Sequence, residues 1–373
     1  MKLLFTLGIF PPSKFGGIAA SMFSVIEELN KTSHEIIVLT TNYKLPYKNK
    51  ITTNKWTEYE GVTVKYIRAR SGISLKFILE GFRQIRNVDQ VHLSGTQYFP
   101  SLLFAIFCNL LGKTAFLSPH GDLMTPALKQ KHWKKVPYLI LLKFFCQKAI
   151  FRPTSEEEAI QIHKLFPKAE VHVIPNFFQF KPPLHLSKLN QIVFLGRICT
   201  IKKIENIILA CSISKFFKSE NYKLLLAGPI AGEFLAYESM LKQLIVINKL
   251  DKNITFLGDV FSPDKEKLLS QSKALFLVSD SENFGNVVIE SLAQGTPVVA
   301  SKGAPWKSLV ENNCGYWIDN SPESIADKID EIISMNASDY KQMSENAIVL
   351  SKEFTSENIL PKWLELINTH TKE

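Results

Sequence analysis

The sequence predicts an α/β protein made of two doubly wound domains, each with a parallel sheet covered by helices on both faces. The chain has 373 residues, a length that suits two domains of about 150–200 residues. Short apolar runs alternate with helical patterns, and this alternation stops at Pro175–Asn190 and then starts again. Hydrophobic residues make up 46% and charged residues 21% of the chain, which is ordinary for a packed globular protein and excludes disorder.

A proline-rich break divides the chain. Pro175, Pro182 and Pro183 mark a linker between the two runs of alternation. We therefore expect an N-terminal domain over residues 1–180, a second domain over residues 181–355, and a C-terminal helix over residues 356–373 that packs back on the N-terminal domain.

The strands of the first domain are short apolar runs. Leu3–Phe10 superficially resembles a signal peptide, but its apolar core has only eight residues and Pro11-Pro12 follows without a small-residue cleavage site. A first buried strand is the better interpretation. We expect strands at Leu3–Phe10, Glu35–Thr40, Val62–Ile67, Gln90–Leu93 and Thr114–Ser118, and helices at Ile18–Leu29 and Leu102–Leu111.

The second domain repeats the alternation of strands and helices, which predicts a parallel sheet covered on both faces. We expect strands at Gln191–Leu195, Lys223–Ala227, Ile254–Leu257, Ala274–Val278 and Pro297–Ala300, and helices at Lys203–Lys215, Asp264–Gln271 and Asn286–Gln294.

Several protein classes find no support in the sequence. No apolar run reaches the roughly 18 residues of a membrane-spanning helix. The five cysteines are scattered and form no CxxC, and the histidines show no metal-ligand spacing, so neither a disulfide framework nor a zinc site is indicated. We expect no metal, no cofactor and a cytoplasmic location, with attachment to the inner face of the cell membrane left open.

Positive charge is concentrated in the first half of the chain. The net charge is +9, of which residues 1–180 contribute +11 and the remainder −2. The densest part is residues 129–152, where no acid lies between Leu123 and Ser155 and cations mix with aromatic and aliphatic residues. Such a segment suits an anionic membrane surface, or else a helix with one core face and one solvated basic face. No signature supports nucleic-acid binding. The cations are Lys129, Lys131, Lys134, Lys135, Lys143, Lys148 and Arg152.

Two loops of the first domain follow strands, where doubly wound sheets bind ligands. Gly16 and Gly17 precede a helix, and backbone amides there suit an anion, although a tight turn is the structural alternative. A nicotinamide dinucleotide site fits poorly, because the pattern is not GxGxxG and the second strand ends in Thr40-Thr41 rather than an acid. His120 follows the strand Thr114–Ser118 and suits a hydroxylated substrate, unless it is a structural histidine.

Two loops of the second domain carry charge. Arg197 follows a strand and Lys202 starts the next helix, which suits a phosphate clamp, although two surface cations are the alternative. Glu282 and Glu290 are eight positions apart, the first in a glycine loop and the second inside a helix, and carboxylates are good acceptors for vicinal sugar hydroxyls. The alternative is helix-dipole complementarity for Glu282 and a surface acid for Glu290. The amides that suit a diphosphate belong to Phe284, Gly285, Asn286 and Val287.

Taken together, these residues resemble the group 1 glycosyltransferases, the large retaining family 4 of the GT-B fold. Glu282 to Glu290 matches the family's E-x7-E motif, and Gly196-Arg197 with Lys202 matches its G-R-x4-K clamp. Gly16-Gly17, His120-Gly121 and the linker Ile174-Pro175-Asn176 match further family positions. The chain departs from the pattern at Lys203 and Phe177, where the family usually has glycine.

The resemblance implies a GT-B fold, two Rossmann-like domains facing across a cleft, and transfer of a hexose-type sugar from a nucleotide-diphospho-sugar, with a UDP-sugar favoured over a GDP-sugar. The acceptor would be a glycan or lipid-linked acceptor in cell-surface polysaccharide synthesis, including lipopolysaccharide, on the side of the N-terminal domain. No DxD motif lies in a suitable loop, which agrees with a metal-independent mechanism. The implied catalytic residues are His120 and Glu282, and the implied donor-binding residues are Gly16, Gly17, Arg197, Lys202, Phe284, Gly285, Asn286, Val287 and Glu290.

Other functions remain as alternatives at this point. A GT-B sugar-nucleotide epimerase would use similar nucleotide contacts, but its acid/base set is not found in the sequence. A non-catalytic nucleotide-sugar binding module would not need Glu282, Glu290, Arg197 and Lys202 together. A periplasmic two-lobed binding protein is disfavoured by the reading of the N-terminus as a strand.

Overall fold

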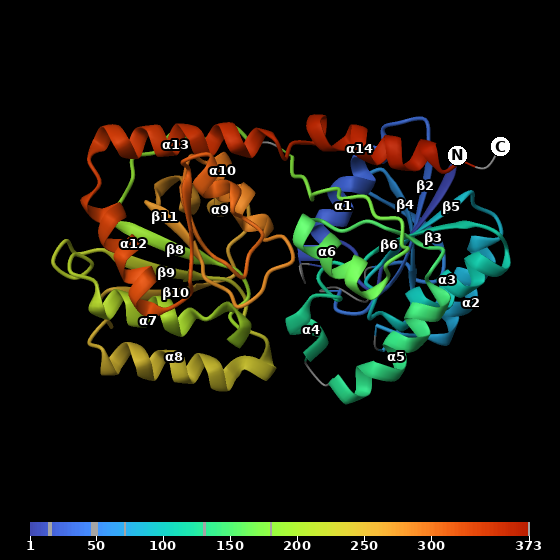
Figure 1. The fold of residues 1–373 in the computed structure, drawn as a ribbon, viewed down its shortest axis with the longest axis horizontal. Coiled ribbons are helices and arrows are strands. Elements are labelled where there is room, and N and C mark those ends of the chain that lie inside the picture. The colour runs from blue at the N-terminus through green and yellow to red at the C-terminus, as the bar shows by residue number, and fades with distance from the viewer. Residues whose placement is uncertain (14–16, 46–50, 71, 130–131, 180, 372–373) are drawn as a thin grey trace. The chain divides into compact units, whose positions relative to one another are not determined.

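The computed structural model describes residues 1–13, 17–45, 51–70, 72–129, 132–179 and 181–371, apart from the side chains of residues 132–134 and 233. It divides into two compact units. Unit 1 comprises Met1–Gln179 and Ser356–Glu373, and unit 2 comprises Phe180–Thr355. Figure 1 shows that each unit has a central sheet with helices on both faces, so the predicted α/β class is confirmed.

Unit 1 contains a seven-stranded sheet of order β3-β4-β2-β1-β5-β6-β7. All neighbours are parallel except β3, which runs antiparallel to β4 at the edge of the sheet. Leu4 pairs with Ile37 on one side and with Val91 on the other, so β1 is central. The strands are β1 (Lys2–Thr6), β2 (Glu35–Thr41), β3 (Trp56–Tyr59), β4 (Val62–Ile67), β5 (Gln90–Ser94), β6 (Thr114–Ser118) and β7 (Ile150–Phe151).

The helices of unit 1 cover both faces of this sheet. Because side chains alternate along a strand, Leu3 and Phe5 enter the core under α1 and α14, whereas Leu4 enters the core under the other helices. Trp363 of α14 is buried in the first of these cores, and Figure 1 shows α14 beside α1. The helices are α1 (Gly17–Asn30), α2 (Leu75–Ile85), α3 (Phe99–Leu110), α4 (Thr125–Lys129), α5 (His132–Phe145), α6 (Glu156–Leu165) and α14 (Ser356–Thr369).

Some expected boundaries in unit 1 are wrong. The first strand ends at Thr6, not Phe10, although Leu7 and Phe10 remain buried in the core. An apolar run indicates that residues are buried, but it does not distinguish buried residues of a strand from buried residues of the loop that follows. The edge strands β3 and β7 were not expected, because one is half exposed and the other has two residues.

Unit 2 contains a six-stranded parallel sheet of order β10-β9-β8-β11-β12-β13. Here the expected strands are confirmed to within one or two residues. The strands are β8 (Gln191–Leu195), β9 (Lys223–Ala227), β10 (Ile254–Gly258), β11 (Ala274–Leu277), β12 (Val298–Ser301) and β13 (Gly315–Ile318).

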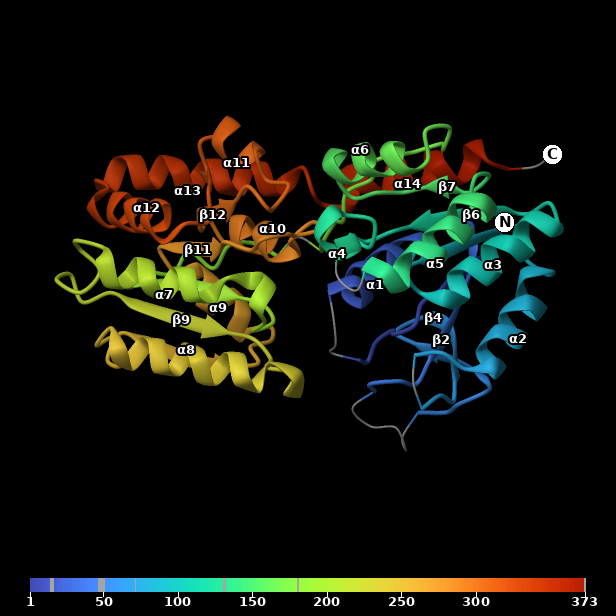
Figure 2. The same cartoon turned by 60° about the horizontal axis from the view of Figure 1, so that its bottom comes forward.

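The helices of unit 2 also pack on both faces. Residues of α7, α8 and α12 share one apolar cluster with the sheet, and Figure 2 shows α7 and α8 together beside β9. On the other face, α10 contacts α9 and α13. The helices are α7 (Ile204–Ile213), α8 (Leu235–Ile247), α9 (Asp264–Gln271), α10 (Asn286–Ala293), α11 (Ser308–Glu311), α12 (Pro322–Ser334) and α13 (Ala337–Lys352), with short 3₁₀ turns η2 (Thr200–Lys202) and η3 (Gly232–Phe234).

Each sheet has one point where the strand order reverses direction. In unit 1 it lies between β1 and β5, and in unit 2 between β8 and β11. The loops that follow such a strand pair diverge to opposite faces and leave a crevice, which is where doubly wound sheets bind ligands. Among the described residues, no helix is both long and apolar enough to cross a membrane.

Candidate active site

A charged pair joins the two loops at the β8/β11 switch point of unit 2. Lys202 lies in η2 after β8, and its Nζ contacts Oε1 of Glu282, which follows β11. Ser279 Oγ donates to the same carboxylate oxygen at 2.6 Å. The side chains of Lys202 and Glu282 are only 15% and 11% exposed, so solvent screens this pair less than a surface pair.

The loop that carries Glu282 is held by its backbone. Asp280 N donates to Ile201 O at 2.8 Å, and Glu282 N donates to Gly303 O at 2.8 Å. A Cβ on Gly303 would lie 2.4 Å from Ser279 O, so only glycine allows this approach. The position of the Glu282 carboxylate is therefore set by three chain segments rather than by one flexible loop.

Helix α10 begins directly after this loop. Gly285 is its N-cap with φ +83°, and a Cβ there would also meet Leu277 Cδ2 at 2.9 Å. Phe284 is buried against the rings of Trp306 and Phe354 at centroid distances of 5.3 Å and 5.8 Å, and Trp306 Nε1 donates to the Phe284 carbonyl. Phe284 therefore offers the site its backbone only, next to the half-buried Asn286 and Val287 in the first turn of the helix.

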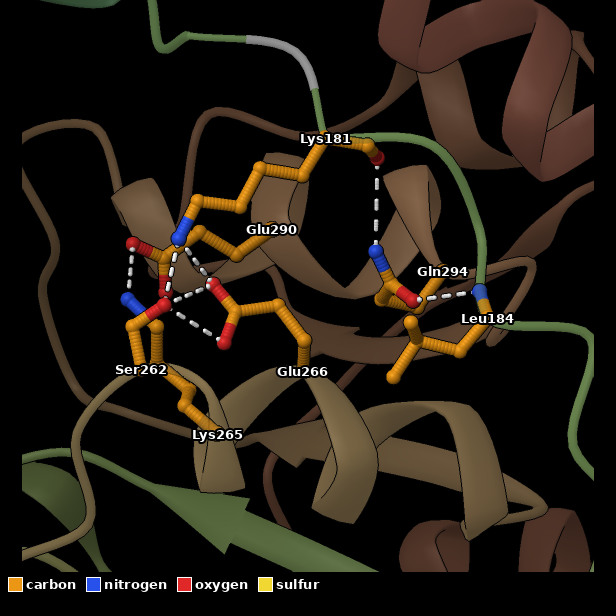
Figure 3. Close-up of polar contacts among 7 residues, drawn as sticks. All are labelled: Lys181, Leu184, Ser262, Lys265, Glu266, Glu290 and Gln294. Carbon is orange, nitrogen blue, oxygen red and sulfur yellow. Dashed lines mark hydrogen bonds and ion pairs between the residues drawn. The ribbon is translucent and has the colours of Figure 1, made fainter.

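Glu290 has a cationic partner that the sequence did not reveal. Lys265 Nζ of α9 lies 2.8 Å from Glu290 Oε1. Figure 3 shows this pair beside a second one, in which Lys181 Nζ contacts Glu266 at 2.6 Å and also Ser262. A ribose held by Glu290 must therefore share or displace Lys265.

Gln294, the C-cap of α10, holds the first residues of unit 2 by hydrogen bonds. Its side chain accepts from Leu184 N at 3.1 Å and donates to Lys181 O at 3.4 Å, as Figure 3 shows. Helices α9 and α10 and the segment after the linker are thus tied together by polar contacts around Glu290.

Arg197 and Lys203 complete the cationic residues at the end of β8. Arg197 is exposed, and it makes no ion pair with any described residue. Lys203 adopts φ +52° and ψ +41°, a left-handed conformation that glycine adopts more readily than lysine. Its ammonium lies 3.4 Å from Asp280 and 3.7 Å from Glu205. Lys203 therefore pairs with different acids from Lys202, which contacts Glu282.

His120, in unit 1, is a buried histidine with a free ring nitrogen. It follows β6 with φ +54°, and its Nε2 has no hydrogen-bond partner among the described residues. Burial, with a smaller effect of the nearby Arg152 charge, lowers the pKa of His120 to about 3. A neutral imidazole with one unsatisfied nitrogen suits a hydrogen bond to a hydroxyl, because a buried polar atom without a partner is costly.

The turn that carries His120 is held by a buried carboxylate. Gly121 N donates to Glu158 Oε1 at 2.5 Å, and Thr154 N donates to Glu158 Oε2 at 2.8 Å. The pattern Ser155-x-x-Glu158 is the sequence signal of a helix capping box, and Ser155 does cap α6. The signal did not predict that Glu158 bonds the His120-Gly121 turn, because that turn lies 37 residues away.

The assignment of Arg152 to the basic surface is wrong. Arg152 is fully buried, its guanidinium lies 4.6 Å from the ring centroid of Trp363, and it donates to Pro175 O at 3.3 Å. Burial lowers its pKa to about 9 against the opposing effect of Glu158. Phe177, the other departure from the family pattern, is buried in the core shared by α1 and α14.

The remaining expected residues lie in unit 1. Gly17 is exposed at the start of α1, and Gly16 lies outside the described residues. The structure brings Lys202 and Glu282 into contact and supports Glu290, Phe284 and Gly285 from neighbouring loops. Lys265 and Trp306 contact Glu290 and Phe284 without any local sequence signal, because each comes from a different segment, whereas Ser279 contacts Glu282 within one loop.

Residues 176–349 match the family described as glycosyl transferases group 1, and the whole chain resembles a glycosyltransferase of the archaeon Methanocaldococcus jannaschii. That protein, the uncharacterized glycosyltransferase MJ1607, is 27% identical over 368 residues, which cover 90% of this chain and 89% of the relative. The chain is a glycosyltransferase whose residues 176–349 match the group 1 family. It transfers a sugar from a nucleotide sugar.

The fold of this glycosyltransferase is similar to those of solved glycosyltransferase structures. Anabaena HepE in complex with UDP and glucose is 17% identical with a TM-score of 0.81, and the match covers 99% of this chain and 100% of that chain. WaaG, a glycosyltransferase involved in lipopolysaccharide biosynthesis, is 13% identical with a TM-score of 0.72, over 98% and 99% of the two chains. The glycosyltransferase therefore has the GT-B fold.

Proposed function

We propose that this glycosyltransferase moves a hexose-type sugar from a UDP-sugar to a glycan or lipid-linked acceptor in cell-surface polysaccharide synthesis, with retention of configuration. The observation that carries the proposal is the Lys202–Glu282 contact at the β8/β11 switch point. It joins one residue of the phosphate clamp to one carboxylate of the E-x7-E motif across 80 positions. HepE, which shares the fold, binds UDP and glucose, and WaaG acts in lipopolysaccharide biosynthesis, which supports the choice of donor and pathway class.

The donor diphosphate is held by cations and helix amides in this proposal. Arg197 and Lys202 neutralise the charge that grows on the departing diphosphate, which is the usual way to stabilise such a transition state. The N-terminus of α10 adds backbone donors and a favourable dipole. Glu290 accepts from the ribose hydroxyls, and Glu282 accepts from the hydroxyls of the donor sugar.

No protein base is assigned to the transfer. In a retaining front-face displacement, the leaving phosphate can accept the proton of the acceptor hydroxyl. His120 is neutral at physiological pH, so we assign it a hydrogen bond to the sugar rather than proton transfer. The roles of Gly16 and Gly17 toward the diphosphate remain predictions from the sequence, and Gly16 lies outside the described residues. A sugar-nucleotide epimerase, the competing activity, would release free UDP when no acceptor is present.

Donor binding tests the assignment directly. Arg197→Ala, Lys202→Ala and Glu290→Ala should each lose about 1.5–3 kcal/mol of UDP-sugar binding free energy in titration calorimetry, because each removes a charged hydrogen bond. Lys341→Ala on α13 is the control, because Lys341 is highly exposed and its ion pair with Glu345 is long, at 3.8 Å. Unchanged affinity in all three site variants would reject the donor site.

We also propose that unit 1 docks on an anionic membrane surface to reach a lipid-linked acceptor. Helix α5 packs Leu142 into the core but presents Val136, Ile140 and Phe144 on another face, and the last two are 62% and 70% exposed. Their spacing of four residues makes one apolar stripe, which is typical of helices that insert shallowly into an interface. Lys129, Lys143 and Lys148 are exposed nearby in the chain, whereas Lys135 donates to Ala127 O at 2.5 Å.

A further inference from the structure

Two potential metal ligands lie on one extended segment of unit 1, away from the strand ends that carry the proposed site. Phe151 N donates to Glu170 O at 2.8 Å, and His172 N donates to Phe151 O at 2.9 Å, so residues 170–172 continue the sheet beside β7. Side chains two positions apart on a strand share a face, so Glu170 and His172 point the same way. Val171, between them, packs against the core on the other side.

The third ligand comes from the far end of the chain. His370 follows α14, and its ring packs edge-on against Phe116 at 5.6 Å between centroids. His370 Nε2 lies 2.7 Å from Glu170 Oε1, and His172 Nε2 lies 2.8 Å from the same oxygen. The three potential ligand atoms all lie within 4.8 Å of one another.

Hydrogen bonds around His370 orient its ring for binding a cation. His370 Nδ1 lies 2.8 Å from Leu366 O, and a metal-bound histidine commonly donates its second N–H to a backbone carbonyl in this way. When Nδ1–H donates to Leu366, Nε2 faces Glu170 with its lone pair, and only a proton or a metal ion between the two atoms makes that contact favourable.

We propose that Glu170, His172 and His370 bind one divalent transition-metal ion, with Zn²⁺ the best match. Two imidazoles and one carboxylate form a ligand set that zinc accepts with bonds of about 2.0–2.2 Å. A tetrahedral site separates its ligand atoms by about 3.3 Å at such bond lengths. The two contacts with Glu170, at 2.7 Å and 2.8 Å, would therefore widen by about half an ångström on binding.

A cavity leaves room for the remaining coordination position. A pocket of about 420 Å³ borders Glu170 and His370, and it is also lined by Asn109, Lys113, Lys148 and Thr371. Water or a small anion that enters through this pocket completes the coordination shell of the metal ion. The two lysines make an anion the better fourth ligand, because the metal with one carboxylate keeps a positive charge.

The metal ion fastens the C-terminal helix to unit 1. Glu170 and His172 belong to the sheet side, whereas His370 follows α14, so one ion links segments 198 positions or more apart. Binding to the folded state alone raises the unfolding temperature of that state. This role is independent of the proposed sugar transfer, and its test needs no donor or acceptor.

Zinc titration of the tag-free, chelator-treated full chain tests the site. Wild type should bind one Zn²⁺ per chain in calorimetry, show visible absorption bands with Co²⁺ in its place, and unfold at a higher temperature with zinc than without. His172→Ala, His370→Ala and Glu170→Gln should each weaken zinc binding by about tenfold or more, since even residues that only support a ligand contribute 10–100-fold. His163→Ala is the matched control, because His163 is exposed on α6 of the same unit and lies outside the cluster.

The variants also separate metal binding from folding. His172 is 39% exposed, so His172→Ala should keep the circular dichroism of wild type while it loses zinc. The proposal is overturned if wild type binds no zinc, or if His172→Ala and Glu170→Gln bind it as tightly as His163→Ala does.

Discussion

The contacts of Glu282 lead to a prediction about turnover. Its carboxylate accepts from Lys202 and Ser279, so it positions the clamp lysine, and the proposed function assigns it the hydroxyls of the donor sugar. We expect Glu282→Ala to lower turnover by about 10–100-fold, the equivalent of one charged hydrogen bond. The affinity for UDP should change little, because Lys202 is released rather than removed.

His120→Ala should behave in the same direction, since its free Nε2 is assigned to the sugar. Its effect on turnover should be the same from pH 6 to pH 8, because the pKa of about 3 keeps the ring neutral. Turnover and UDP titration calorimetry on both variants measure this. Wild-type turnover in both, with the true donor, would contradict the roles given to Glu282 and His120.

Lys203 shows the cost of a side chain where the backbone is left-handed. At φ +52° a non-glycine residue costs about 1 kcal/mol or more, and the partly exposed pair with Asp280 returns only part of this. We expect Lys203→Gly to unfold at equal or higher denaturant concentration than wild type, and Lys203→Ala at lower. Urea unfolding of the three proteins decides the order, and a less stable glycine variant would show that the Asp280 contact matters more than backbone strain.

At the scale of elements, β5 contains a histidine that makes unit 1 sensitive to acid. His92 stacks between Phe5 and Phe116 at 4.4 Å and 4.6 Å, and burial lowers its pKa to about 3. The unfolded chain binds a proton near pH 6.5 that the folded chain does not. Stability therefore falls as the pH drops below about 6.5, by up to about 1.4 kcal/mol per pH unit.

His92→Phe should remove this dependence while it preserves the ring stack. The unfolding temperature of wild type should fall more between pH 7.5 and pH 5.5 than that of His92→Phe. The buried acids Asp122 and Glu158 titrate in both proteins, so the difference isolates His92. Equal falls in the two proteins would show that His92 is not a buried neutral base.

At the scale of the whole molecule, the uneven charge and the apolar stripe on α5 predict salt-sensitive membrane binding. The chain should sediment with anionic vesicles at low salt, release at high salt and ignore zwitterionic vesicles. Each cation near such a surface contributes about 1 kcal/mol, and salt screens it.

A variant with Lys143→Glu, Phe144→Ser and Lys148→Glu should lose vesicle binding and keep its affinity for UDP. These three residues are exposed, so the fold should tolerate the changes. Lys341→Ala serves again as the control. If wild type stays in the supernatant with anionic vesicles at low salt, the membrane proposal fails and the transferase assignment is unaffected.

The sequence by itself determined the fold class, most strands of unit 2 and the motifs at their ends. Gln191–Leu195, Lys223–Ala227 and the helix Asp264–Gln271 coincide with β8, β9 and α9, because such elements are encoded by periodicity over a few neighbouring residues. The left-handed N-cap at Gly285 was not predicted, because N-cap residues usually have extended backbone.

Only the tertiary structure decided which groups meet. Arg152 belongs to a basic stretch of sequence yet is buried against Trp363, and Lys265 neutralises Glu290 from another helix. Glu170 and His370 are 200 positions apart, so no spacing rule links them. Such contacts arise where strand order and helix packing bring distant segments together, and a pattern confined to neighbouring residues carries no information about them.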